Sequence, residues 1–430
     1  MITKLVLERF KNFEKAEITL GPLTVLIGAN ATGKSNLRDA FRFLHGIGRG
    51  YTFAEILGEK YGVGGELVWK GIRGGPREVA YRQAETFALE VTTGGWKLFR
   101  PRPIHPSEKY PGPFKYRIEV APGRENNTTR LVKESLYIGD VLVFETNPAD
   151  EDDSRITLTL YGAQGRLKQL RTADQPVLPQ IPNLVLERPQ DMEVDAIAII
   201  TPIVMGFIDL LGSMRFLDPV PETLRQPSFP GQIVLGDQGE HLASVLQAIC
   251  AYPKRKQALV NRVRELTPMD VANLDFSLDD YSGQVRLILE DDGQRFSTHS
   301  ASDGTLRFLT ILAALFSPGP AQLYFFEELE TGLHPTRLYL LLDFIEKQAE
   351  KVPLRVITTS HSPQMLRFLN ATSRDHVAVI YRLPGSSAAR IKQLRDFPPE
   401  ARKVIESKDL AKLHDSGWFE TVALFMQGEE

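Results

Sequence analysis

The sequence predicts an α/β fold with two lobes, in which a mainly parallel sheet flanked by helices is joined to an antiparallel β subdomain and a helical region. Three observations predict this fold. The last third of the chain alternates apolar, strand-like runs with helical patterns. A G-x-x-x-x-G-K-S stretch follows an apolar run near the N-terminus. Between about residues 79 and 170, short runs of alternating polarity are separated by turn signals.

The composition is that of a folded protein with a packed core. Of the 430 residues, 42% are hydrophobic and 24% are charged, which argues against extensive disorder. The net charge of −3 provides no general attraction to nucleic acid or to anionic membranes. The single cysteine, Cys250, cannot form an internal disulfide, so we expect a cytoplasmic protein. The first ten residues, MITKLVLERF, alternate in polarity as a strand does, unlike a signal peptide.

One apolar stretch, residues 194–214, has the composition of a membrane span at first sight. Asp195, Pro202 and Asp209 interrupt it. Its uncharged part is shorter than the roughly 20 residues that a span requires. We therefore expect a buried core helix here, or a pair of helices broken at Pro202, and no membrane among the partners.

The first two thirds of the chain predict a sequence of strands followed by helices. Two short strands, at residues 5–9 and 16–20, precede an apolar strand that begins at Leu23 and a helix that begins near Ser35. Residues 51–77 are rich in glycine and predict a loop with some short helix. The antiparallel β region follows. Helical patterning returns from about residue 184, and residues 284–296 predict a hairpin.

The last third predicts the parallel sheet. Strands at residues 323–326, 354–358 and 377–381 alternate with helices that follow Gly304, Pro335 and Pro363. Parallel strands of such a sheet end at one edge, where ligands collect. We divide the chain into a core formed by residues 1–50 and 276–430, a β-rich inserted lobe at 51–183 and a helical subdomain at 184–275.

The stretch GANATGKS, residues 28–35, has the spacing of a phosphate-binding loop. Its two glycines let the backbone curl so that successive N–H groups point at phosphate oxygens, and the following helix start adds partial positive charge. Lys34 can reach the β- and γ-phosphates, and the Ser35 hydroxyl can bind Mg²⁺. The alternative is a glycine-rich turn before a helix. The predicted nucleotide-binding residues of this segment are Gly28, Ala29, Asn30, Ala31, Thr32, Gly33, Lys34, Ser35 and Asn36.

The stretch YFFEELETGLHP, residues 324–335, places acidic residues directly after an apolar strand. A phosphate-binding loop needs a second anchor for Mg²⁺ and a residue that orients water, and both are expected at the end of another strand. We predict that Glu327 faces the metal through water and that Glu328 polarises the attacking water. The alternative is a surface cluster of acids at a loop.

Four segments resemble the motifs of ABC-type ATPase heads. In chain order, GANATGKSN, SASDGTLRFL, FFEELETGLHP and VITTSHSPQML are similar to Walker A, the signature, Walker B with the D-loop, and the switch-histidine segment. The chain resembles in particular the RecF/SMC-like predicted AAA ATPases, the group that includes the ATPase part of OLD-family proteins. The resemblance covers both ends of the chain and is vague between about residues 51 and 183. It implies ATP and Mg²⁺ as ligands.

The resemblance also implies roles for three further segments. In such heads the signature of one subunit caps the γ-phosphate held by another subunit, so Ser302 would supply a hydroxyl and Gly304 a backbone N–H. From the residues alone, this segment is an ordinary helix cap. His361 resembles the histidine that touches the γ-phosphate, whereas a lone histidine after a strand is usually structural. Residues 330–334 match the D-loop, which assigns Glu330 to a dimer interface.

The chain departs from the family pattern at several positions. The family often has aspartate where this chain has Glu327, so the metal contact must be rearranged or more fully mediated by water. It often has glycine at the position of Ala31, and because alanine lacks glycine's freedom at positive φ, we expect the loop to avoid that conformation there. By location alone, Gln180 and Gln190 are candidates for the Q-loop glutamine.

These features favour an ATP hydrolase that acts as a head-to-head homodimer or higher oligomer in DNA repair or anti-phage defence. The alternative is a nucleotide-gated scaffold or sensor, with negligible turnover, that recruits a separately encoded effector nuclease. DNA is a candidate partner in either case. The chain has no heptad run for a coiled-coil arm and no Asp-x-Asp after His361 for a Toprim nuclease, so we expect no nuclease activity of its own. The SDG signature counts against a transporter subunit.

Overall fold

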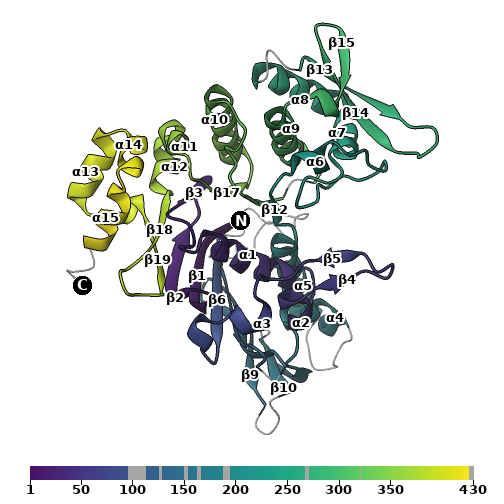
Figure 1. Ribbon diagram of the computed structural model, residues 1–430. Helices are drawn as coiled ribbons and strands as arrows, with labels where there is room; N and C mark the ends of the chain where they lie inside the picture. Colours follow the sequence, from purple (N-terminus) through teal and green to yellow (C-terminus); the bar gives the residue numbers. More distant parts are fainter. Residues whose placement is uncertain are drawn as a thin grey trace.

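Two large sheets pack on opposite sides of one helix, α1 (Lys34–Gly48). The computed structural model describes residues 1–94, 113–124, 128–149, 154–161, 166–186, 194–266, 271–319 and 321–425. Phe41 of α1 contacts Phe325 in the first sheet, with ring centroids 6.4 Å apart. Phe43, two residues further on, contacts Phe87 in the second sheet at 5.4 Å. The helix that follows the predicted phosphate loop is therefore enclosed between the sheets (Figure 1).

The first sheet has six strands in the order β12-β16-β17-β3-β18-β19. The first five strands are parallel, and β19 runs antiparallel to β18 at one edge. The predicted parallel sheet is thus present. Its parallel strands end at one edge, next to the start of α1. The strands are β3 (Leu23–Ile27), β12 (Arg215–Leu217), β16 (Leu323–Phe326), β17 (Arg355–Thr359), β18 (Ala378–Arg382) and β19 (Ala389–Gln393).

Both faces of this sheet are buried, which explains the continuous apolar run before the acids. In β16, Leu323 and Phe325 point into a core shared with α1 and the antiparallel sheet. Tyr324 and Phe326 point into a second core, formed with helices on the opposite face. Side chains alternate between the two faces of a strand, so a central strand with helices on one side and α1 on the other has no polar position.

The second sheet is antiparallel and has eight strands in the order β11-β10-β9-β8-β7-β6-β1-β2. It begins with the two N-terminal strands, which pair through β1 with β6. The β-rich segment after residue 51 therefore continues a sheet that starts at residue 2. The strands are β1 (Ile2–Phe10), β2 (Phe13–Thr19), β6 (Phe87–Thr93), β7 (Phe114–Ala121), β8 (Arg130–Ile138), β9 (Val141–Pro148), β10 (Arg155–Tyr161) and β11 (Arg166–Thr172).

Helices on the far side of the parallel sheet form a separate layer with a small three-stranded sheet (Figure 1). The C-terminal helices lie at the opposite end of the molecule from this small sheet (Figure 1). The layer contains α6 (Pro221–Leu224), α7 (Leu242–Cys250), α8 (Pro253–Leu266), β13 (Asn273–Leu278), β14 (Val285–Asp291), β15 (Gln294–Ser297), α9 (Asp303–Phe316) and α10 (Pro335–Lys351). The C-terminal group contains α11 (Pro363–Phe368), α12 (Ala371–Asp375), α13 (Pro399–Ser407), α14 (Leu410–Asp415) and α15 (Trp418–Phe425).

Short elements complete the chain. Residues 51–77 contain short helix, as predicted, and also a two-stranded sheet. These elements are α2 (Phe53–Leu57), β4 (Lys60–Tyr61), β5 (Leu67–Trp69), α3 (Gly75–Glu78) and, further on, α4 (Ile181–Leu186). The division into core, inserted lobe and helical subdomain stays a prediction, and strands β1, β2 and β12 connect these three parts through shared sheets.

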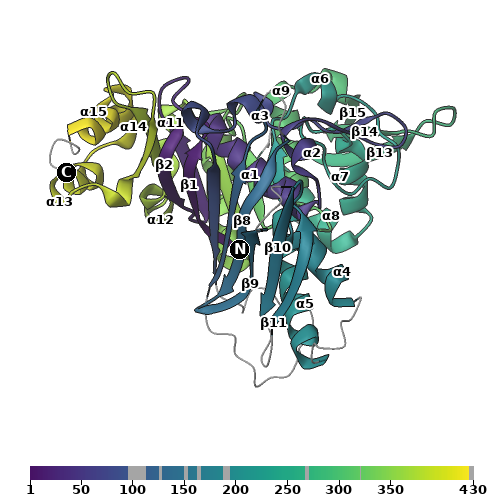
Figure 2. The ribbon, with the colours of Figure 1, turned by 90° about the horizontal axis from the view of Figure 1, so that it is seen from below.

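The apolar stretch after residue 193 forms one helix, α5 (Val194–Gly212), which continues through Pro202. Of the two expected forms, the single core helix is the one present. Phe207 is buried against Phe114 and Tyr116 of the antiparallel sheet, with ring centroids 6.1 and 5.4 Å apart. Figure 2 shows α5 and α4 beside strands β10 and β11. Within the described residues, none of the helices combines the length and apolar character needed to cross a membrane.

Candidate nucleotide-binding site

The predicted phosphate loop connects the end of β3 to the start of α1. Gly28 and Gly33 have φ angles of 141° and 129°, which side-chain-bearing residues rarely adopt. Space restricts both positions as well. A Cβ atom on Gly28 would lie 2.1 Å from the carbonyl oxygen of Ile380, and one on Gly33 would lie 2.8 Å from Nδ2 of Asn12. Both glycines are therefore required by the conformation of the loop.

Ala31 has a φ angle of 60°, so the prediction that the loop avoids positive φ there is wrong. An L-residue in this region costs about 1–2 kcal/mol. The turn around it is held by Thr32, whose Oγ1 donates a hydrogen bond to the carbonyl oxygen of Ala29 at 2.9 Å. Ala31 itself is exposed, so its methyl group meets no crowded surroundings. The loop therefore holds an alanine in a conformation that favours glycine.

The Lys34 ammonium is folded back onto its own loop. Its Nζ donates hydrogen bonds to the carbonyl oxygens of Gly28 at 2.6 Å and Ala29 at 3.1 Å. Burial lowers the pKa of Lys34, and the carboxylates of Glu328, Glu327 and Glu420 oppose that shift. The amine can exchange these neutral carbonyl partners for phosphate oxygens without any break of an ion pair.

Asn12, in the turn between β1 and β2, forms hydrogen bonds that hold the phosphate loop. Its Nδ2 donates to the carbonyl oxygen of Thr32 at 2.8 Å, and its Oδ1 accepts from Nδ2 of Asn36 at 2.8 Å. Sequence reasoning missed this residue. The only signal for it was a polar residue between Phe10 and Phe13, where an apolar strand reverses direction.

Glu327 begins directly after β16 and is held from two sides. Its Oε1 lies 3.4 Å from Nη1 of Arg38 on α1, and its Oε2 accepts from Oγ1 of Thr359 on β17 at 3.3 Å. The carboxylate therefore lies at the edge where the parallel strands end, beside the phosphate loop.

Glu328 is exposed and has a φ angle of 45°. Its backbone N–H donates to Oγ1 of Thr359 at 3.0 Å, and its Oε2 accepts from Oγ1 of Thr331 at 3.0 Å. Positive φ in a residue with a long side chain is uncommon and concentrates at functional sites. The strained turn directs Glu327 and Glu328 differently although they are neighbours in the chain.

Glu330 connects the residues after β16 to the residues after β17. Its Oε1 accepts hydrogen bonds from Oγ of Ser360 at 2.7 Å and from the backbone N–H of His361 at 3.1 Å. Its Oε2 is buried and has no hydrogen-bond partner in the described part of the chain. The assignment of Glu330 to a dimer interface stays a prediction, and within the chain this carboxylate positions the segment that carries His361.

These segments converge on one cavity of about 460 Å³. It brings together most of the phosphate loop, both acids and His361. Arg73 and Thr359 also line it, and sequence reasoning did not predict either of them. The lining residues are Asn30, Ala31, Gly33, Lys34, Ser35, Asn36, Arg73, Glu327, Glu328, Thr359 and His361. The predicted residues Gly28, Ala29 and Thr32 lie behind this lining and shape the loop.

The signature residues Ser302 and Gly304 are not among those that line this cavity. Ser302 caps α9, and its Oγ accepts from the backbone N–H of Thr305 at 3.1 Å. Gly304 lies against the D-loop segment, since a Cβ atom there would be 2.1 Å from the carbonyl oxygen of Gly332. The predicted signature and D-loop segments are thus in close backbone contact.

A family model described as "AAA domain, putative AbiEii toxin, Type IV TA system" matches residues 23–98 and 211–367, more than half of the chain. The chain belongs to this AAA_21 family. The matched ranges contain the predicted phosphate loop, the predicted signature residues, both acids and His361. The unmatched residues 99–210 contain most strands of the antiparallel sheet, and helices α12 to α15 follow the second matched range.

This AAA_21 chain is also similar to individual proteins of known name or structure. An ATP/GTP phosphatase of Helicobacter pylori is 21% identical over 388 residues, which cover 87% of this chain and 89% of that protein. The structure of an SMC head bound to the C-terminal winged-helix domain of ScpA shares 13% identity and a TM-score of 0.51, with 91% of this chain and 97% of that chain covered. An SMC head of Pyrococcus furiosus, with an extended coiled coil, shares 12% identity and a TM-score of 0.45 over 94% and 98% of the two chains.

The family match and the likeness to the first SMC head establish an α/β P-loop NTPase fold of the SMC-head type, as predicted. The chain is a RecF/SMC-like AAA ATPase by family. The residues of the site fit a nucleotide with Mg²⁺. Ser35 and Glu327 present oxygen ligands, which Mg²⁺ prefers, and Lys34 presents an ammonium to the same cavity.

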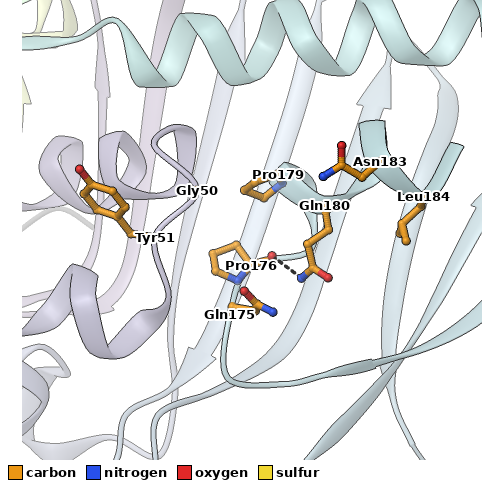
Figure 3. Close-up of a pocket in the computed structure, with 8 residues that line it drawn as sticks. All are labelled: Gly50, Tyr51, Gln175, Pro176, Pro179, Gln180, Asn183 and Leu184. Atoms are coloured by element: carbon orange, nitrogen blue, oxygen red, sulfur yellow. Dashed lines mark hydrogen bonds between the residues drawn. The ribbon is translucent and has the colours of Figure 1, made fainter. Parts of the chain in front are cut away.

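The Q-loop glutamine is not Gln180 in this AAA_21 domain. Gln180 lines a second cavity of about 270 Å³, shown in Figure 3, and its Nε2 donates to the carbonyl oxygen of Pro176 at 2.9 Å. That cavity also contains Gly50 and Tyr51, which follow the C-terminal end of α1. A helix of 15 residues is about 20 Å long, so Gln180 lies a whole helix away from the phosphate loop. Gln190 lies outside the described residues.

Arg73 reaches the nucleotide cavity of the AAA_21 domain from the glycine-rich segment before α3. Its Nη2 and Nε lie 3.0 and 3.2 Å from Oδ2 of Asp39, which is buried in α1. Lys11 is 3.7 Å from the same oxygen and also donates to the backbone oxygen of Arg73. The Arg73 side chain is 58% exposed. Sequence reasoning did not predict Arg73, because residues 51–77 have only a weak hydrophobic pattern.

Proposed function

We propose that this protein binds ATP with Mg²⁺ and hydrolyses it, and that two copies close around two nucleotides. The observation that carries the proposal is the convergence of Lys34, Ser35, Glu327, Glu328 and His361 on one cavity, from three separate parts of the chain. The name of the Helicobacter pylori relative, an ATP/GTP phosphatase, supports hydrolysis of a nucleotide.

Each side chain has a role that its chemistry supports. Lys34 exchanges its loop carbonyls for the β- and γ-phosphates, and backbone N–H groups of the loop hold the remaining oxygens. Ser35 and Glu327 would hold Mg²⁺, which neutralises charge on the phosphates. Glu328 orients the attacking water and accepts its proton, for which an exposed carboxylate at the cavity is suited. His361 donates a hydrogen bond to the γ-phosphate.

The surface formed by the signature and the D-loop supports a dimer. Ser302 and Gly304 are not among the residues that line the cavity of their own chain, which supports a role for the Ser302 hydroxyl and the N–H groups at the start of α9 toward a nucleotide held by another copy. A head-to-head homodimer would place each signature against the other copy's phosphate loop. Closure by ATP and opening by hydrolysis would then bias a partner protein through its differential affinity for the two states.

The biological setting that we propose is bacterial defence or DNA repair, together with a separately encoded effector. The family description names a toxin of a type IV toxin–antitoxin system, which supports defence. The SMC head that this chain resembles was solved with a domain of a partner protein, ScpA, which supports a partner for this head as well. DNA enters the proposal as a candidate regulator of turnover.

Glu328→Gln tests the catalytic assignment. Glutamine keeps the size of the side chain but cannot take a proton, so the variant should bind ATP, release no phosphate and accumulate as a dimer on size-exclusion chromatography with ATP. Thr331→Val is the matched control, because it removes the hydroxyl that donates to Glu328 and keeps the carboxylate. If Glu328→Gln hydrolyses ATP at the wild-type rate, Glu328 does not orient the water.

A second function is favoured by one observation, the hydrogen bond between Thr331 and Glu328. It ties the proposed catalytic carboxylate to Thr331 of the predicted D-loop. A protein in which this hydrogen bond persists with ATP bound would act as a nucleotide-gated scaffold that recruits an effector nuclease. Phosphate release with and without DNA separates the two functions, because turnover well below about 1 s⁻¹ in both conditions would favour the scaffold.

A further inference from the structure

Arg38 lies one helical turn after Lys34 and makes the contact to Glu327 described above. Its Nη1 is 3.4 Å from Oε1 of Glu327, and both side chains are only 19% exposed. Sequence reasoning assigned a metal contact to Glu327 and no role to Arg38. A partly buried cation thus lies against the carboxylate that, under the proposed function, is to bind Mg²⁺.

Arg38 is not among the residues that line the nucleotide cavity. It approaches Glu327 from α1. Its Nε is buried and, within the described part of the chain, has no hydrogen-bond partner. The guanidinium therefore depends on Glu327 for compensation of its charge.

The length of Glu327 is what allows this pairing. The carboxylate spans from Arg38 on α1 to Thr359 on β17, with contacts of 3.4 and 3.3 Å to the two side chains. Aspartate, one methylene shorter, could not keep both contacts. The contact with Arg38 therefore accounts for glutamate at this position.

We propose that Arg38 is a positioning residue that competes with Mg²⁺ for the Glu327 carboxylate and thereby weakens binding of the Mg²⁺ that accompanies ATP. This inference rests on the proposed function, since it concerns the metal that accompanies ATP. Metal bound to Glu327 withdraws the carboxylate from Arg38 and leaves a buried guanidinium less compensated. Loss of one partner from a buried ion pair is costly, so Arg38 opposes the metal.

The test is the ratio of two dissociation constants for ATP, one in EDTA and one with saturating Mg²⁺, measured by calorimetry on the intact chain. This ratio reports how much Mg²⁺ contributes to binding and cancels general effects on ATP affinity. We expect Arg38→Leu to raise the ratio about tenfold, because close charge pairs typically couple by at least about 1.5 kcal/mol. Arg38→Lys keeps the charge and should stay within about threefold of the wild type. Glu327→Asp should break the contact to Arg38, so that a subsequent Arg38→Leu change has little further effect.

Three results would overturn the inference. The first is an unchanged ratio in Arg38→Leu. The second is a raised ratio that comes from weaker ATP binding in EDTA and not from tighter binding in Mg²⁺, which would mean that Arg38 binds the phosphates. The third is an equal increase from Arg38→Leu in the wild-type and Glu327→Asp backgrounds, since the two side chains would then act independently. If the wild type binds no ATP in either condition, the proposed function itself fails, and that result is distinct from the other three.

Discussion

Gly304 in the signature and Gly332 in the D-loop are in backbone contact. A Cβ atom on Gly304 would lie 2.1 Å from the carbonyl oxygen of Gly332, and Gly332 has a φ angle of 78°. The start of α9 and the loop after β16 are therefore fixed against each other by two residues that have no side chain. Any movement of one surface must displace the other.

Gly304→Ala should reduce turnover and leave ATP affinity unchanged. The added methyl group pushes the D-loop away from α9, and a displacement of about 1 Å in a catalytic segment can cost about 100-fold in rate. Gly304 does not line the nucleotide cavity, so binding has no reason to change. Phosphate release and calorimetry measure the two effects. Gly319→Ala is the control, because a Cβ atom there meets nothing within 4 Å. Wild-type turnover in Gly304→Ala would contradict the coupling.

Glu330→Ala should lower turnover with little effect on ATP affinity. The change removes the acceptor that holds Ser360 and the backbone N–H of His361, so His361 loses its fixed position. We expect a decrease in kcat of about 10-fold to 100-fold, as for other groups that orient a catalytic residue. Glu330→Gln retains an acceptor oxygen and should recover most of the rate. If the alanine and glutamine variants have the same kcat, the hydrogen bonds from Glu330 to residues 360 and 361 do not control turnover.

Glu420→Gln should tighten ATP binding. Glu420 lies on α15, after the second range matched by the family, and its carboxylate helps to keep the pKa of Lys34 from falling further. The same negative charge opposes the phosphates, so its removal should lower the dissociation constant by about twofold to fivefold at low salt and less at high salt. Glu406→Gln, an exposed position on α13, is the control. Weaker binding in Glu420→Gln would show that Glu420 supports Lys34 more than it repels ATP.

Glu134 should make the stability of the fold depend on pH. It is fully buried on β8 and accepts hydrogen bonds from Tyr116 and from the backbone N–H groups of Val177 and Leu178, at 2.8, 2.6 and 2.9 Å. Burial raises the pKa of this carboxyl from 4.5 to about 7. The folded state then holds the proton more tightly than the unfolded state, so protonation of Glu134 stabilises the fold. This contribution to the free energy of unfolding is complete below pH 4.5. It is lost as the pH rises through 7.

Urea unfolding of the wild type and of Glu134→Gln at pH 5 and pH 8 measures this effect. Relative to Glu134→Gln, the wild type should lose up to about 3 kcal/mol of its free energy of unfolding between pH 5 and pH 8, at about 1.4 kcal/mol per pKa unit. Both proteins keep His45, whose pKa burial lowers to about 4, so its opposite contribution cancels in the comparison. A difference that does not vary with pH would show that Glu134 does not titrate in this range.

Local patterns were sufficient for much of the fold. The predicted strand at 323–326 and the helix after Pro335 match β16 and α10, because a doubly buried strand is apolar at every position and proline favours a helix start. The same patterns could not show that β1 and β2 continue into β6 or that β12 joins β16. Strand pairing across more than 70 residues depends on tertiary packing, and a strand of three residues such as β12 has no periodicity to detect.

The sequence by itself determined the fold class and predicted the chemistry of the site. Fixed spacing brings glycines, Lys34 and Ser35 to one helix start, and parallel topology brings Glu327, Glu328 and His361 to the same edge. The tertiary structure alone decided how these groups are held. Asn12 contacts the phosphate loop and Arg73 lines the cavity beside it, both from elsewhere in the chain, and Ala31 has a positive φ although alanine does not favour it. Arg38 contacts Glu327, which lies 289 positions later in the sequence. This contact depends on the packing of α1 against β16, and no local sequence pattern indicates it.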